Sequence, residues 1–171
     1  MSAAAQRAEL AALGRDLMAL RGTAGERRAA ALLTPCPDTP PSRFADLLRA
    51  PEWLRWPRAA QEQLAQVVAL RSVAPALAGS INGAWLGALA KAAGEDAVDW
   101  AIAAGMDRAQ AEGQPVAPGE LAARGFAILR AALPPGLRAY LVGVPISGPA
   151  SAEPEIVAEA LAFVAAREAA A

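Results

Sequence analysis

GSINGAWLGALAKAAGEDAVDWAI, residues Gly79 to Ile102, is the stretch that decides the fold. Its apolar residues recur at helical spacing on both sides of Gly94. We therefore expect Gly94 to end a first helix, because glycine readily adopts the backbone conformation of a helix terminator. Glu95 and Asp96 then lie in the first turn of a second helix, where the helix dipole favours negative charge. The stretch predicts two helices joined at Gly94 and buried in the core.

Three glycines in this stretch, Gly79, Gly83 and Gly87, are four residues apart and share one face of the predicted helix. A glycine inside a helix costs about 1 kcal/mol relative to alanine, so a series of them is expected where another backbone packs closely. We interpret this face as an internal helix crossing, with Ser80 as the helix cap. An exposed glycine face would instead indicate a surface for a partner.

The same spacing is found where membrane helices dimerise, and no charged residue occurs from Ser72 to Ala90. A run of this length approaches the roughly 20 residues that span a bilayer. However, most of the run is Ala and Gly, and Pro75 and Asn82 interrupt it. Its transfer to lipid would be weakly favourable. We therefore expect a buried helix and no direct membrane insertion.

The composition is typical of a helical domain with a core of small apolar side chains. The chain has 171 residues, of which 55% are hydrophobic but only 5% aromatic, and this length suits one domain. Its 16 Lys and Arg balance 17 Asp and Glu, which argues against a nucleic-acid partner. The N-terminus lacks the basic start and apolar core of a signal peptide. We expect a cytoplasmic protein.

The residue inventory excludes several classes of enzyme and metal site. The chain has no histidine and a single cysteine, Cys36, so an internal disulfide, a Ser-His or Cys-His pair and a conventional zinc site are all excluded. Glu95, Asp96 and Asp99 are neighbouring carboxylates, but acids at a helix start are usually caps and dipole partners. No phosphate-binding or dinucleotide-binding motif occurs. We predict a non-enzymatic protein without catalytic, cofactor-binding or metal-binding residues.

The predicted fold class is all-α. We expect a single compact domain over residues 1–171, with about seven to nine helices, some of them short, and proline-rich connections. An N-terminal helical pair (1–33) is followed by a loop with four prolines (34–42). The core helical region (43–171) comes next. Whether residues 1–42 belong to the same packed domain stays open at this point.

Within the core region, prolines mark the helix starts. Pro57 is predicted as the first residue of one helix, Pro118 to Leu133 form another, and a last helix begins near Pro154. The segment from Leu137 to Val144 is apolar enough for a helix or a strand, and we favour the helix.

The candidate partner-binding residues lie in the segment PEWLRWPR, residues 51–58. They are Trp53, Arg55, Trp56 and Arg58. Two interpretations are open for the tryptophans. Both rings can cover the core beneath a loop, or one of them can belong to a partner-binding surface flanked by the arginines. The second interpretation has a physical basis, because Trp and Arg supply much of the binding energy of protein interfaces.

Two blocks of this sequence resemble the SctK family, the YscK-type accessory proteins of the type III secretion sorting platform. The first block is LAQVVALRSVAPALAGSINGAWLGALAKAAGEDAVDWAI, Leu64 to Ile102. The second is ELAARGFAILRAALPPGLRAYLVGVP, Glu120 to Pro145. The shared features are an apolar helix, a small-residue turn with a GALAKAAGEDAVDWAI-like segment, and a further helix leading into a leucine-rich piece that ends in proline.

This resemblance implies a non-enzymatic adapter in the bacterial cytoplasm. Such an adapter links the cytosolic domain of the inner-membrane ring protein to the pod protein of the sorting platform, which holds the stator and the ATPase. It would reach the inner membrane through protein contacts alone. The alternative is a stand-alone helical regulatory or chaperone-like module that holds a peptide between helices.

Overall fold

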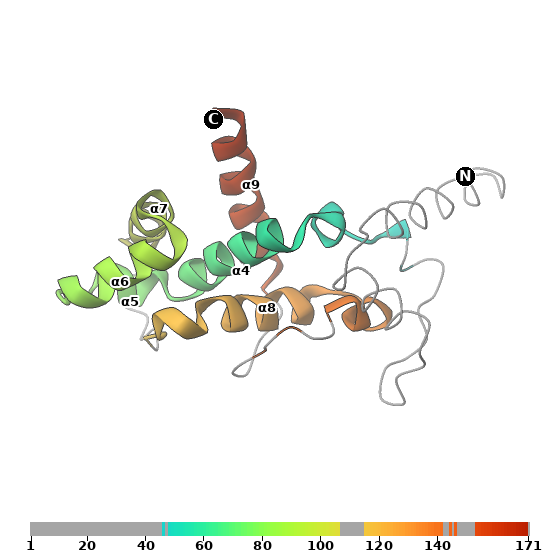
Figure 1. The fold of residues 1–171 in the computed structure, drawn as a ribbon, viewed down its shortest axis with the longest axis horizontal. Coiled ribbons are helices and arrows are strands. Elements are labelled where there is room, and N and C mark those ends of the chain that lie inside the picture. Colours follow the sequence, from blue (N-terminus) through green and yellow to red (C-terminus); the bar gives the residue numbers. More distant parts are fainter. Residues whose placement is uncertain are drawn as a thin grey trace. The chain divides into compact units, whose positions relative to one another are not determined.

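The computed structural model describes residues 48–106, 115–141 and 153–170, together with Asp46, Val144 and Ile146 (Figure 1). This part of the chain is all-α, as predicted: it holds six α-helices and three 3-10 helices with defined bounds, and no strand. The N-terminal helical pair and the proline-rich loop fall outside the described residues. The predicted total of about seven to nine helices is therefore not confirmed.

The chain divides into two compact units. The first comprises Met1–Gln61 with Leu133–Gly143, and the second comprises Glu62–Ala132 with Val144–Ala171. The single domain over residues 1–171 stays a prediction.

A buried glutamine anchors the described part of the first unit. The 3-10 helix η1 (Glu52–Arg55) precedes α4 (Arg58–Ser72), whose first turn carries Gln61. Gln61 is 1% exposed, and its Nε2 donates to the carbonyl oxygens of Trp53 at 3.1 Å and Leu54 at 2.9 Å. Because buried polar groups are stable only when they are hydrogen-bonded, these two bonds fix η1 against the start of α4.

The ambiguous segment near residue 140 is helical. It forms the 3-10 helix η3 (Pro135–Leu141), with Leu137 and Leu141 buried. Nε of Arg138 donates to the carbonyl oxygen of Leu133 at 3.2 Å, which ties η3 to the residue after α8. The predicted helix is confirmed as far as Leu141.

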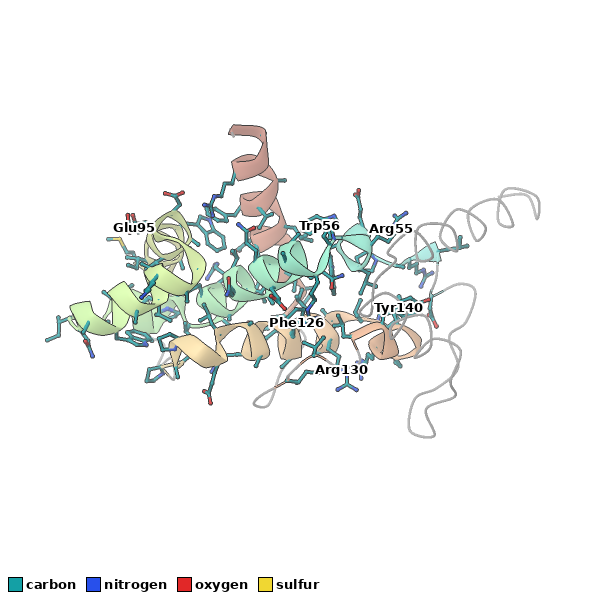
Figure 2. All side chains as sticks on the ribbon, viewed as in Figure 1. Arg55, Trp56, Glu95, Phe126, Arg130 and Tyr140 are labelled. Carbon is teal, nitrogen blue, oxygen red and sulfur yellow. The ribbon has the colours of Figure 1, made fainter. Side chains whose placement is uncertain are left out.

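The second unit contains the rest of α4 and six further helical elements. These are α5 (Ala74–Ala78), α6 (Gly83–Ala93), α7 (Glu95–Met106), η2 (Pro118–Glu120), α8 (Leu121–Ala132) and α9 (Pro154–Ala170). α5 packs against α7, α6 packs against α7 and η2, and α8 contacts α9. The largest fully buried side chains of this unit are Leu64, Val67, Val68, Leu70, Val73, Leu77, Leu89, Leu121, Phe126 and Leu129. Figure 2 shows Phe126 in the layer between α8 and α4.

The predicted helix boundaries hold closely. Gly94 joins α6 to α7 with a φ of 96°, the one positive φ in the described part of the chain. α8 and α9 begin at their predicted prolines, α8 through the short η2. One cap and one helix start differ from the prediction. Asn82, not Ser80, caps α6 by accepting from the amide of Trp85 at 3.1 Å, and Pro57 lies just before α4 instead of inside it.

The predicted glycine crossing is wrong. Gly83 and Gly87 are exposed, and a Cβ added at either would meet no atom within 4 Å. Gly79 follows α5, outside the helix α6. The reason is the rotation of the helix: α6 buries Leu89 and Ala93, which lie on a different side of the helix from Gly83 and Gly87.

The close crossings occur instead at Gly125 and Gly105. A Cβ added at Gly125 would lie 2.8 Å from the Cα of Ala65 and closer still to its carbonyl group, so α8 touches the backbone of α4. One added at Gly105 would lie 2.5 Å from the carbonyl carbon of Ala74, so α7 touches the backbone of α5. α4 and α8 therefore run side by side at backbone distance (Figure 1).

Gly125→Ala tests the crossing of α8 over α4. The added methyl group has no room beside Ala65, so we expect the free energy of unfolding to fall by about 2 kcal/mol, as in other overpacked cores. Gly87→Ala is the matched control, because it makes the same change in an open helix position and should raise stability by about 0.5–1 kcal/mol. Urea unfolding of both variants gives the comparison. Equal stabilisation by both substitutions would contradict the crossing.

Candidate functional site

The four candidate partner-binding residues do not form one surface. Trp53 is 3% exposed and belongs to the core of the first unit. Arg55 is exposed, whereas Trp56 and Arg58 are half-buried. Figure 2 shows Arg55 and Trp56 beside the start of α4. Trp56, Arg55 and Arg58 therefore stay candidates for a partner-binding surface. Trp53 instead packs in the core.

A second candidate surface lies on α6, which the sequence led us to expect in the core. We define the α6 face as the exposed residues Ile81, Gly83, Ala84, Gly87, Ala88 and Lys91. Ile81 is fully exposed. The helical members are spaced by three and four residues, so they follow one side of the helix. The face presents small apolar groups, with its single charge at Lys91.

The α6 face is exposed, whereas other sides of helix α6 are fixed to the second unit. Leu89 is 0% exposed and Ala93 is 7% exposed, and both point into the second unit. The indole Nε1 of Trp85 donates to the carbonyl oxygen of Val116 at 2.8 Å, which ties α6 to the segment before η2. Together with the Asn82 cap, these contacts fix the orientation of the helix. The outward side is therefore a defined surface.

The neighbouring carboxylates at the start of α7 are surface groups. Glu95, Asp96 and Asp99 are all exposed, and Glu95 is shown at that helix start in Figure 2. The carboxylate of Asp96 lies 3.9 Å from Nε of Arg167 on α9. No group of three or more His, Cys, Asp and Glu side chains within the described ranges could hold a metal ion.

Tyr140 lies in the 3-10 helix η3 and is partly buried. Burial raises the pKa of its phenol above the ordinary value of 10.0, because the charged form would lose hydration. The phenol is therefore neutral at physiological pH.

The uncharged run from Ser72 to Ala90 is divided among α4, α5 and α6. Of the helices that the structure describes, none combines the length and the apolar character needed to cross a bilayer.

Comparison of the chain with protein-family models, with curated proteins and with solved structures gave no match.

The two tryptophans of residues 51–58 are expected to behave differently. Trp53→Ala removes a buried ring and should lower the free energy of unfolding by about 3–5 kcal/mol. Trp56→Ala removes a half-buried ring and should cost less than about 1.5 kcal/mol. Chemical denaturation followed by circular dichroism measures both. A Trp56→Ala variant as unstable as Trp53→Ala would remove the case for Trp56 as a partner-binding residue.

Proposed function

We propose that this protein is a non-enzymatic adapter in the cytoplasmic sorting platform of a bacterial type III secretion system. In this role it binds the cytosolic domain of the inner-membrane ring protein and the pod protein that holds the stator and the ATPase. It is cytoplasmic and reaches the inner membrane only through these protein contacts.

The observation that carries this proposal is the α6 face. Exposed sides of helices usually carry polar and charged residues, whereas here Lys91 is the single charged member. Apolar surface exposed in one patch is typical of protein-binding sites. The face also lies within Leu64 to Ile102, the block in which the resemblance to the SctK family is most extensive.

The chemistry of the face favours a helix as its partner. Gly83 and Gly87 leave open space where side chains would otherwise stand, so the backbone of a partner helix can approach closely. Ile81 at the start of the face offers an apolar anchor, since its side chain is fully exposed. Burial of such a side chain contributes roughly 1.5–3 kcal/mol. Trp56 with Arg55 and Arg58 is the second candidate contact.

The alternative function, a stand-alone regulatory or chaperone-like module, would use the same apolar face. It differs in its partners: it would bind client peptides and not the ring and pod proteins. The identity of the captured proteins distinguishes the two functions.

Substitutions on the α6 face test the proposal. Ile81→Ser removes the anchor, and Gly87→Leu fills the open space that a partner backbone would use, without a clash inside the chain. We expect each to lower recovery of the ring and pod proteins about tenfold, which corresponds to 1.4 kcal/mol. The measurement is a cross-linked pull-down from a secreting bacterium, quantified by mass spectrometry.

Met106→Ser is the matched control, because Met106 is 69% exposed at the far end of α7. This variant should recover both proteins normally. If the unsubstituted protein recovers neither the ring nor the pod protein, the adapter function is wrong. If it recovers both, but equally with all variants, the adapter function stands and the α6 face is not its contact.

A further inference from the structure

Three hydrogen bonds hold the short helix η1 in one conformation. The carbonyl oxygen of Trp53 accepts from the amide of Trp56 at 3.2 Å and from Nε2 of Gln61 at 3.1 Å. The same Nε2 donates to the carbonyl oxygen of Leu54 at 2.9 Å. Because Gln61 is 1% exposed, water does not compete freely for these bonds. Loss of the Gln61 amide would leave buried carbonyl groups without this donor.

Prolines restrict the chain on both sides of η1. Pro51 precedes the helix with φ −65° and ψ 146°, and its ring fixes the first of these angles. Trp56 follows the helix with φ −62° and ψ 152°, the extended conformation that a residue before proline adopts. Since hydrogen bonds and prolines already fix its backbone, η1 loses little conformational freedom when a partner binds, and such preorganisation favours affinity.

The outward side of this segment carries one aromatic and two cationic side chains. Arg55 is exposed, and Trp56 and Arg58 are half-buried; we call these three residues the η1 site. Both arginines also have an interaction within the chain. A guanidinium group has five N–H donors, so an arginine with an internal contact can still bind a carboxylate of a partner. Trp and Arg are the residues that most often dominate the binding energy of interfaces.

The charge around the η1 site favours an acidic partner. Residues 49–58 contain three arginines and one acid, Glu52. Arg49, the third arginine, is exposed. Partner surfaces are usually of complementary charge, which directs encounter and excludes partners of like charge.

We propose that the η1 site binds an acidic segment of a partner protein, and that Gln61 positions this site. The partner's carboxylates bind Arg55 and Arg58, and its apolar side chains pack on the indole of Trp56. Gln61 does not touch the partner and acts through the conformation of η1. This inference rests on the adapter function, for which it names the chemistry of the second contact.

Charge reversal tests the acidic partner. Purified ring-protein cytosolic domain and purified pod protein are each titrated onto the chain by calorimetry, at about 50 and about 300 mM NaCl. We expect Arg55→Glu to raise the Kd of one of them about tenfold at low salt and to reduce the salt dependence of that binding. Arg130→Glu is the matched control, because it makes the same change at an exposed position of α8 and should bind as the unsubstituted chain does.

A double-mutant cycle tests the positioning role of Gln61. Gln61→Met keeps a side chain of similar size but removes the donor, and we expect it to raise the same Kd about fivefold. In a chain that already carries Trp56→Ala, the same change should alter the Kd less than about twofold, because Gln61 acts through the η1 site. Gln63→Met is the control, since Gln63 is half-buried on α4 and makes neither bond to η1.

The outcomes separate this inference from the adapter function. If the unsubstituted chain binds neither protein, the adapter function is wrong and the inference falls with it. If it binds, but Arg55→Glu and Arg130→Glu bind equally well, the adapter function stands and the acidic contact is overturned. Additive effects of Gln61→Met and Trp56→Ala would overturn the positioning role. Arg55→Glu decides the contact even if Gln61→Met does not fold, because Arg55 is exposed.

Discussion

The backbone contact between α8 and α4 is the constraint on which the second unit depends. At Gly125 the two helices approach so closely that no side chain fits between them, and Gly105 brings α7 onto α5 in the same way. Such crossings suit a chain with only 5% aromatic residues, because small side chains fill the narrow space at native density. Helix α6 lies at the periphery of the unit. It buries Leu89 and leaves the side with Gly83 and Gly87 exposed.

The sequence predicted helix positions well because their signals are local. Gly94, the prolines before α4 and α8, and Pro154 at the first position of α9 act on their own backbone, and all mark helix boundaries. The glycine face was misplaced because glycine serves equally at a tight crossing and at an open helix surface. Only tertiary packing decides between these, and neighbouring residues do not show it. The same applies to Trp53, whose segment is held by the amide of Gln61 eight residues later.

Two kinds of contact hold the helices of the second unit together. Glycine and alanine set the distance between α4 and α8 and between α5 and α7, where the backbones are in contact. Charged and aromatic pairs set the register of α9 through Arg71 and Trp100. Close apolar crossings are difficult to open, since every contact is lost at once, whereas an ion pair regains water on separation. The second unit thus combines closely packed helices with the exposed α6 face.

The most direct test of this account is the distance between α8 and α4 in solution. In protein labelled at glycine and alanine, the account predicts a strong nuclear Overhauser effect between the Hα protons of Gly125 and Ala65. The protons of Gly87 should show none to any other helix, because a Cβ added there would meet no atom within 4 Å. A well-dispersed spectrum without the Gly125–Ala65 cross-peak would contradict the crossing, and with it the arrangement of the second unit.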